Sequence, residues 1–179
     1  KSGEVYPEWL SVSAIRDSRG QTQSYVAVFS DLTEIHRAQL LAERMALEDA
    51  MTGLGNRSAF VQQLDKRIGE LAQKQRYAGM VIVDIDRFKS INERSGLIFG
   101  DRLLKGVAMR LRQQLGLEHF VARIGADEFG ILLAHQSGSR DEVGHFALDM
   151  VEKLLIRLHE DYRIEGERIE LEFSIGIVV

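Results

Sequence analysis

Two pairs of acidic residues stand beside apolar runs that read as strands. Asp84 and Asp86 follow the apolar run 80–83, and Asp127 with Glu128 lies about forty residues further on. Carboxylate oxygens are ligands that Mg²⁺ prefers, and this ion usually takes one or two of them together with substrate phosphates. The two acidic pairs together therefore indicate a magnesium–nucleotide centre.

The second acidic pair belongs to the segment Gly125-Ala126-Asp127-Glu128-Phe129, which lies between the apolar runs 120–124 and 129–133. This pattern predicts a β-hairpin over residues 120–133 with the acids in its turn. Small residues beside the acids let a phosphate approach the backbone. Plainer interpretations stay open, since aspartate is common in turns, Asp84 can cap the segment after its strand, and Glu128 can be an exposed surface residue.

The elements that must position these acids alternate between helix and strand. Apolar spacing predicts helices over 57–76, 101–115 and 141–159, strands over 79–85 and 169–179, and the hairpin 120–133. Helices packed on a central, mostly antiparallel sheet make an α/β (α+β) fold.

The first part of the chain predicts a separate hairpin and a helix. Residues 4–30 read as two antiparallel strands joined at Asp17–Gly20, and an isolated hairpin of this kind is marginal in water, so it needs partners. A helix is predicted over 33–47. Its apolar residues are spaced three, four and three, which suits either pairing with a copy of itself or packing on the chain's own domain: Ile35, Ala38, Ala42 and Met45.

Composition narrows the class of protein. The 179 residues are 45% hydrophobic and 28% charged, as expected for a soluble globular chain with one domain or one domain and part of another. A net charge of −4 argues against a nucleic-acid binder, and the absence of cysteine excludes disulfides and thiolate metal sites. No apolar stretch has membrane-spanning length and no signal-peptide pattern opens the chain. We expect a cytoplasmic chain without membrane contact, whose parent protein can still carry an anchor.

Five motifs occur in order along the chain: Thr52–Arg57, Asp84–Asn92, Gly100-Asp101, Arg123–Phe129 and Ser174–Gly176. This series resembles the GGDEF domain, the catalytic domain of diguanylate cyclases. The resemblance implies a palm-like βαββαβ core and bacterial cyclic di-GMP signalling. It also implies that two GTP molecules condense to cyclic di-GMP and pyrophosphate in a dimer, with Mg²⁺, or alternatively Mn²⁺, as cofactor.

The resemblance assigns metal binding to the carboxylates of Asp84 and Asp127 and to the carbonyl of Ile85. It places Glu128 near the ribose hydroxyl and the metal, where a carboxylate can help to deprotonate the attacking 3′-OH. These assignments make Asp84, Asp127 and Glu128 the catalytic residues. Asp86 is interpreted as structural.

Nucleotide binding is assigned by the resemblance to Phe88, Lys89, Asn92, Asp101, Gly125 and Ala126. A carboxylate at 101 can accept hydrogen bonds from guanine, and the amide of Asn92 can satisfy a further base atom. The resemblance places Phe88 and Lys89 in a loop whose backbone amides cradle phosphates, as helix N-termini do, and it places Glu93 and Leu97 in a loop before Gly100. Alternatively, Asp101 is a helix N-cap after Gly100, Asn92 ends a helical turn, and Lys89 is a surface lysine.

Three departures from the family pattern bear on activity. Ala126 replaces the second glycine of the signature, with a cost of about 1 kcal/mol or more if that position needs a positive φ, and only local crowding otherwise. Glu93 and Leu97 replace the usual Asp and His near the guanine. The Arg-x-x-Asp of the family's product-inhibition site is replaced by Gly116 and His119, so this feedback site is expected to be absent.

We therefore expect three regions. Residues 1–32 resemble the C-terminal part of a PAS sensor domain, 33–48 form a signalling linker helix, and 49–179 form a C-terminally truncated GGDEF domain. The resemblance implies homodimerisation through the linker helix and the PAS region. An alternative is a degenerate GTP-binding module that regulates an attached EAL-type phosphodiesterase, and a third is a dimerisation relay. The hairpin at the start can also be unrelated to PAS domains.

Overall fold

The computed structural model describes residues 5–179, apart from the side chains of Leu40, Glu43 and Arg44, and these residues form two compact units that divide after Met45. Residues 1–4, where the predicted PAS-like region begins, lie outside the described residues. Each unit is described by itself below.

The first unit contains a hairpin and a helix, as predicted. Strands β1 (Glu8–Arg16) and β2 (Thr22–Asp31) pair antiparallel, and helix α1 (Thr33–Leu47) follows. Asp31 caps the start of the helix, because its Oδ1 accepts a hydrogen bond from the Thr33 amide at 2.8 Å. Large apolar side chains of the hairpin are exposed, among them Trp9 and Phe29, in keeping with a hairpin that needs partners. Its assignment to a PAS domain stays a prediction.

The second unit is built on a four-stranded sheet. Its strand order is β4-β5-β3-β8, and every neighbouring pair is antiparallel. The strands are β4 (Phe120–Arg123), β5 (Glu128–Ser137), β3 (Tyr77–Ile85) and β8 (Phe173–Val178). The prediction of a mixed fold on a mostly antiparallel sheet is confirmed.

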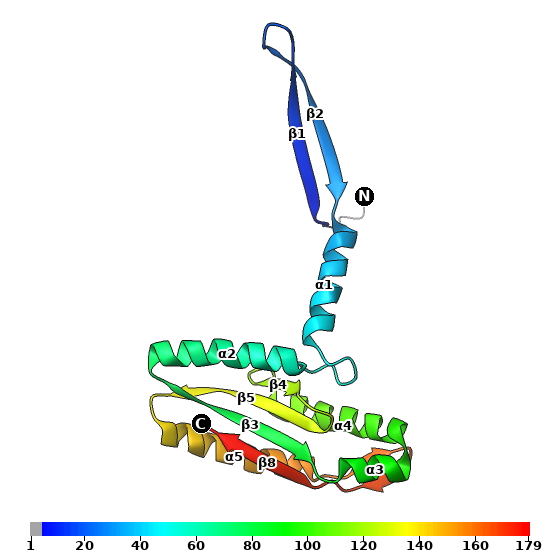
Figure 1. The fold of residues 1–179 in the computed structure, drawn as a ribbon, viewed down its shortest axis with the longest axis vertical. Helices are drawn as coiled ribbons and strands as arrows, with labels where there is room; N and C mark the ends of the chain where they lie inside the picture. The colour runs from blue at the N-terminus through cyan, green and yellow to red at the C-terminus, as the bar shows by residue number, and fades with distance from the viewer. Residues whose placement is uncertain (1–4) are drawn as a thin grey trace. The chain divides into compact units, whose positions relative to one another are not determined.

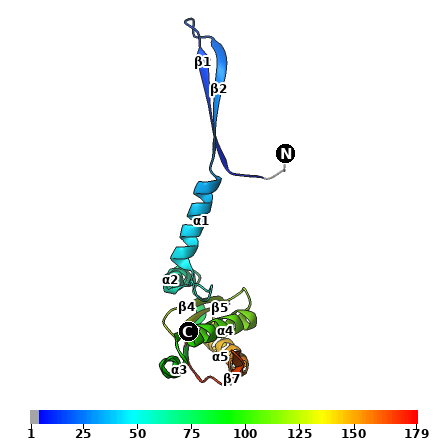
Figure 2. The ribbon, with the colours of Figure 1, turned by 90° about the vertical axis from the view of Figure 1, so that its right-hand side faces the viewer.

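Helices cover the two faces of this sheet (Figures 1 and 2). Helix α2 (Arg57–Lys74) packs on one face, where its Phe60 joins Ile82 and Leu132. Helices α4 (Leu97–Leu115) and α5 (Arg140–Leu158) pack on the other face. In the described part of the chain, no helix is long and apolar enough to cross a membrane.

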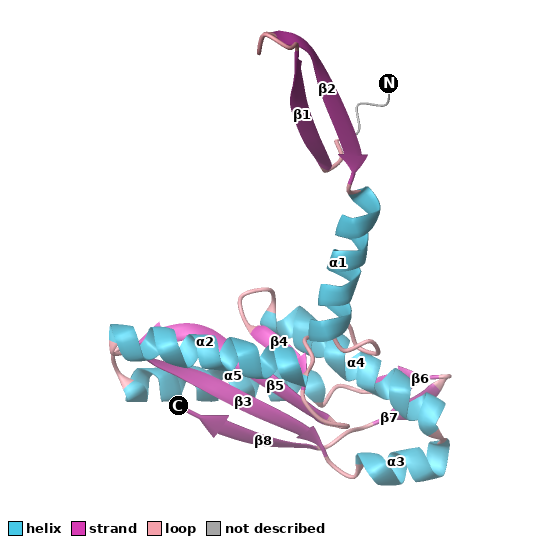
Figure 3. Cartoon of the chain, turned by 45° about the horizontal axis from the view of Figure 1, so that its top comes forward, coloured by secondary structure: helices cyan, strands magenta, loops and turns pink. Residues whose placement is uncertain are grey.

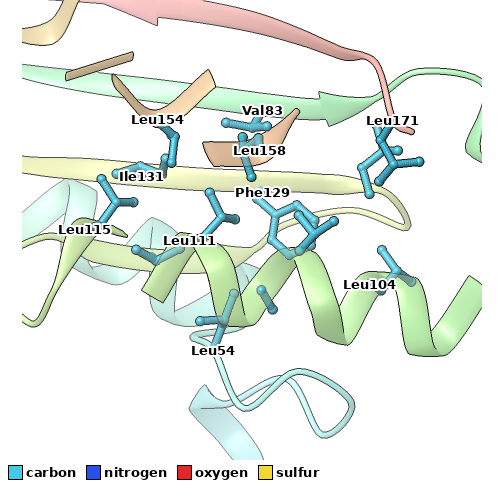
Figure 4. Packing of buried hydrophobic residues seen from close by; sticks show 14 of the residues in the cluster. Leu54, Val83, Leu104, Leu111, Leu115, Phe129, Ile131, Leu154, Leu158 and Leu171 are labelled. Carbon is cyan, nitrogen blue, oxygen red and sulfur yellow. The ribbon is translucent and has the colours of Figure 1, made fainter. Parts of the chain in front are cut away.

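The larger core lies between the sheet and helices α4 and α5. Alternate residues of β3 point into it because side chains along a strand alternate between faces, and Val81 and Val83 are fully buried there. Leu104 and Leu111 of α4 face Phe129 of β5 (Figure 4). Each fully buried side chain of this size contributes about 1.5–3 kcal/mol, so this core fixes the ends of β3 and β5.

The structure differs from the predicted elements in three places. The residues interpreted as loops include helix α3 (Phe88–Ser95), and α4 begins at Leu97 instead of residue 101. Gly96, with φ of 89°, separates these two helices. The strand predicted over 169–179 is divided into β7 (Glu167–Ile169) and β8, and β7 pairs with β6 (Tyr162–Ile164). Glu165 and Gly166 both have positive φ, as a tight two-residue hairpin turn requires.

Candidate metal and nucleotide site

The acidic residues of the two predicted pairs meet at one end of the sheet. Asp84 of β3 lies directly opposite Glu128 of β5, so both side chains belong to the face that α2 covers. The carbonyl of Asp127 accepts a hydrogen bond from the Ile85 amide at 3.2 Å, which holds the hairpin turn against the end of β3. The structure thus brings Asp84, Asp127 and Glu128 together.

The charges at this end of the sheet repel one another. Partial burial, followed by the neighbouring carboxylates of Asp127, Glu128 and Asp86, raises the pKa of Asp84. Within the described residues, none of the ion pairs involves Asp84, Asp127 or Glu128. This concentration of negative charge without a cationic partner suits a bound cation.

The donor set fits Mg²⁺ held jointly with a substrate. Across the described part of the chain, no group of three acidic, histidine or cysteine side chains is close enough to enclose a metal ion by itself. Mg²⁺ needs near-octahedral oxygen ligands and is commonly bound by one or two carboxylates, with waters and phosphates as the remaining ligands. Asp84 and Asp127 offer two carboxylates for such a shared site.

Backbone hydrogen bonds shape the turn that carries Asp127. The amides of Ile124 and Gly125 both donate to the carbonyl of Glu128, at 2.9 and 3.3 Å. Arg123 donates to the carbonyl of Ala126 at 2.6 Å, and its other terminal nitrogen lies 3.5 Å from Asp49. Arg123 is therefore a structural residue of the turn.

Ala126 adopts an ordinary backbone conformation. The non-glycine residues of positive φ in the described chain are Gln75, Arg87 and Glu165, so alanine at 126 carries no left-handed strain. Its effect is confined to the space that its methyl group occupies. At Gly125 a side chain would collide with the carboxylate of Glu128 and would lie 3.1 Å from its Cβ, so glycine lets the Glu128 side chain fold over the turn.

Asp86 has a structural role. Its Oδ1 accepts a hydrogen bond from Ser174 Oγ at 2.7 Å, and its amide donates to the carbonyl of Glu172 at 3.0 Å. These bonds fasten the start of β8 beside the end of β3. The geometry agrees with the sequence interpretation of Asp86.

Phe88 and Lys89 are the first residues of α3, directly after the end of β3 (Figure 3). Arg87 precedes them in a left-handed conformation with φ of 56° and makes no side-chain cap, so the first amides of the helix are not capped. Uncapped amides at a helix N-terminus can bind a phosphate. The side chain of Phe88 is buried, while that of Lys89 is exposed and lies 3.8 Å from Glu93.

Asn92 carries a buried polar atom without a partner, on the face of α3 that meets α4. Its Oδ1 makes no hydrogen bond within the described structure. A Cβ placed on Gly100 would overlap this oxygen and would lie 2.9 Å from the Asn92 Cγ. Buried polar atoms are normally paired, so an orphan atom beside a close helix contact indicates a position that a ligand can satisfy.

Asp101 lies inside α4, in its second turn, so it is not a helix N-cap; Gly96 occupies that position. The sequence alternative for Asp101 is therefore wrong, because the helix starts four residues earlier than predicted. Asp101 directly follows Gly100, whose Cβ position overlaps Asn92. Leu97, which replaces the family's histidine, is exposed on the first turn of the same helix.

Two functional features were not found from the sequence. The first is α3 itself, which turns the supposed phosphate loop into a helix N-terminus. The second is the close approach of Gly100 to Asn92. A glycine beside Asp101 was a usable signal for that approach, because glycine is favoured where another group comes near the backbone.

Gly116 and His119, which occupy the positions of the product-inhibition motif, have structural roles. Gly116 ends α4 with φ of 65°. Nδ1 of His119 accepts a hydrogen bond from the Ala134 amide at 3.1 Å, and partial burial lowers the pKa of the imidazole. Neither position offers the charged group that the family motif carries there.

Comparison with known proteins gives a consistent result. Residues 46–179 match the family model described as diguanylate cyclase, GGDEF domain. Diguanylate cyclase TpbB of Pseudomonas aeruginosa (strain UCBPP-PA14) is 32% identical over 155 residues, which cover 83% of this chain and 34% of TpbB. Cyclic di-GMP phosphodiesterase PdeR of Escherichia coli K12 is 33% identical over 150 residues, which cover 84% of this chain and 22% of PdeR.

Among solved structures, the GGDEF domain of TpbB from Pseudomonas aeruginosa superposes with a TM-score of 0.65 and 34% identity, covering 73% of each chain. The chain thus spans about a third or less of the length of these two curated relatives, and most of the length of the solved domain.

Proposed function

This chain belongs to the GGDEF domain family of diguanylate cyclases, and we propose that it binds GTP with Mg²⁺ and condenses two GTP molecules to cyclic di-GMP. The observation that carries this proposal is the meeting of Asp84, Asp127 and Glu128 at one end of the sheet, followed along the chain by α3 with the unpaired Oδ1 of Asn92. The acidic residues would then hold the metal at the phosphate end of the nucleotide, and Asn92 would bind its base.

Asp84 and Asp127 hold the ion, together with the carbonyl of Ile85. Mg²⁺, or Mn²⁺ in its place, neutralises the phosphate charge and orients the α-phosphate when it is bound. Glu128 accepts the proton of the attacking 3′-OH. Each new bond from a 3′-oxygen to an α-phosphorus replaces a phosphoanhydride bond, and each of the two steps releases one pyrophosphate.

Guanine binds between α3 and α4. The Asp101 carboxylate accepts hydrogen bonds from the N–H donors of the base, and the amide of Asn92 satisfies a further base atom. The first amides of α3, at Phe88 and Lys89, donate to the phosphates. Gly125 and Ala126 form the backbone surface against which the nucleotide packs.

The reaction needs two domains, because each domain holds one GTP and the product joins both. Helix α1 supports pairing with a second copy, since Ile35, Ala38, Ala42 and Met45 are all exposed on it. We propose that α1 and the PAS-like hairpin form the homodimer contact. The hairpin's exposed apolar face fits a role beside further sensor-domain structure.

The second candidate is a regulatory module that binds GTP without turning it over. Ala126 favours it, because the methyl group occupies space against which the nucleotide would pack. Glu93 and Leu97 favour it too, since both alter the surroundings of the guanine. In this case the module would regulate an attached EAL-type phosphodiesterase.

One assay separates the two functions. The protein is incubated with GTP and Mg²⁺, and cyclic di-GMP and pyrophosphate are quantified by chromatography. The cyclase predicts one cyclic di-GMP for every two pyrophosphates. GTP that binds but is recovered unchanged would instead support the regulatory module.

A further inference from the structure

A hollow lies against a different face of α3 from Asn92, beside the segment that leads from β7 to β8. Figure 3 shows α3 and this segment at the same end of the second unit. Its volume is about 710 Å³, within the range of small-molecule sites. One wall is α3, and the other is the segment 170–172 between β7 and β8. None of the residues assigned above to metal or nucleotide binding lines it.

The floor of this hollow is apolar. Ile169 and Leu171 contribute it from the β7–β8 side, where both are buried, and Ile91 of α3 completes it. Such a floor suits a ligand with an apolar body. The rim carries the polar groups.

Opposite charges stand on the two walls of the hollow. Arg87 and Arg94 belong to the α3 side, and Glu170 and Glu172 belong to the facing segment. Among the described residues, none of the ion pairs within 4.0 Å includes any of these four. The charged side chains of the two walls therefore make no direct ion pair across the hollow, and a ligand that carries both signs would bridge them.

The formal charge of the residues that line the hollow indicates which class of ligand it can bind. With Asp86, three carboxylates and two guanidinium groups line the hollow beside His159, so its formal charge is negative when the histidine is counted as neutral. A polyanion such as a nucleotide triphosphate is disfavoured there, because like charges repel in a partly enclosed site. A zwitterion meets both walls without that repulsion.

We propose that this hollow binds a free amino acid with an apolar or aromatic side chain. Its carboxylate pairs with the guanidinium groups of Arg87 and Arg94, which match carboxylate geometry. Its ammonium group lies between Glu170 and Glu172, and its side chain covers the apolar floor.

The ligand would also act on the proposed guanine site, and this part rests on the proposed function. Helix α3 carries Arg94 on the side of the hollow and Asn92 on another face, so a ligand that shifts α3 changes the affinity for GTP. Linkage requires the reverse effect to be equal, so GTP changes the affinity for the amino acid by the same factor.

Calorimetric titration of the nucleotide-free protein tests the binding directly. The probes are L-leucine, L-methionine, L-phenylalanine and L-tryptophan, together with phenethylamine and 3-phenylpropionate, which each lack one charge of phenylalanine. We expect at least one amino acid to bind, and each single-charge analogue to bind at least about tenfold more weakly than phenylalanine. Failure of all four amino acids, or equal binding of the analogues, would overturn the proposal.

Charge variants locate the site. Arg94→Glu should weaken amino-acid binding at least about tenfold. Lys105→Glu, an equal charge reversal at an exposed position outside the hollow, should leave it unchanged. The double variant Arg94→Glu/Glu170→Arg exchanges the charges between the walls and should regain most of the affinity, because a zwitterion can bind in the reverse direction. If Arg94→Glu and Lys105→Glu lose the same amino-acid affinity, or if the double variant regains none, the assignment of the site is contradicted.

Coupling is measured by repeating the GTP titration at a saturating concentration of the amino acid. A change in GTP affinity in the native protein and none in Arg94→Glu is expected. Amino-acid binding without any change in GTP affinity would overturn the coupling alone. Failure of GTP to bind at all would contradict the proposed function while the amino-acid titration still stood.

Discussion

Asn92 and Gly100 approach each other so closely that residue 100 has no room for a side chain. A Cβ on residue 100 would overlap Oδ1 of Asn92 and would lie 3.1 Å from the ring of Phe88. This contact sets the position of the Asn92 amide and the spacing of α3 and α4. Both helices contribute to the proposed guanine site, so Gly100 is a positioning residue for the base.

Replacing Gly100 with alanine should therefore displace the Asn92 amide. We expect GTP affinity to fall by about tenfold or more, and stability to fall by about 1–3 kcal/mol from overpacking. Gly69→Ala is the matched control, because Gly69 is also helical but has open space around its Cβ position. The control should keep GTP affinity and gain up to about 1 kcal/mol of stability. Unchanged GTP affinity in Gly100→Ala would contradict the positioning role.

Asp101→Ala should weaken GTP binding without unfolding the domain. The variant removes a charged hydrogen-bond partner worth about 1.5–3 kcal/mol, or roughly 10- to 150-fold in affinity. Thermal stability should stay the same or rise slightly, because alanine favours a helix interior more than aspartate does. Calorimetry and a thermal melt measure the two effects. A lower melting temperature with normal GTP affinity would mean that Asp101 serves the fold and not the base.

Ala126→Gly tests the departure in the signature. Alanine at 126 is not strained, so glycine brings no relief of backbone strain and acts only by removing a methyl group. We expect higher GTP affinity or a faster cyclase rate, and a loss of stability of up to about 1 kcal/mol because glycine is freer in the unfolded chain. If affinity and rate both stay the same, Ala126 is a tolerated variant and Glu93 or Leu97 becomes the cause of any low activity.

His119 predicts a pH dependence of stability. Burial holds its pKa below the ordinary value of 6.5, so the unfolded chain takes up a proton more readily than the folded one. The contribution of His119 to stability is therefore complete above pH 6.5 and declines as the pH falls below that value. His119→Gln removes this titration. The difference in unfolding free energy between the native protein and the variant should shrink between pH 7 and pH 5, and a constant difference would contradict the burial of a neutral imidazole.

Much of the fold was predictable because its periodic signals are strong. The alternation in β3 and the apolar face of α4 follow directly from side-chain spacing, and the acids at the strand end and hairpin turn indicated the site. Helix α3 was not found, because its eight residues are mostly polar and offer only a short apolar period. The β6–β7 hairpin escaped notice because Glu165-Gly166 lacks the Asn or Asp that usually marks such a turn.

Contacts between different helices and loops could not be predicted from the periodicity of the sequence. The overlap of Asn92 with the Cβ position of Gly100 depends on how α3 crosses α4, and the charged hollow depends on how the segment 170–172 passes α3. Neither relation has a periodic signature. The sequence also could not decide whether Ala126 has a positive φ, because that depends on the conformation of the hairpin turn.

The central claim is that Asp84 and Asp127 hold one Mg²⁺ with GTP, and a double-mutant cycle on magnesium-dependent binding tests it most directly. GTP affinity is measured with a non-hydrolysable analogue, with Mg²⁺ and with chelator, for the native protein, Asp84→Asn, Asp127→Asn and the double variant. We predict that Mg²⁺ strengthens binding to the native protein, that each single variant loses most of this gain, and that the double variant loses little more. Full magnesium dependence in either single variant, or losses that add in the double variant, would contradict a shared ion.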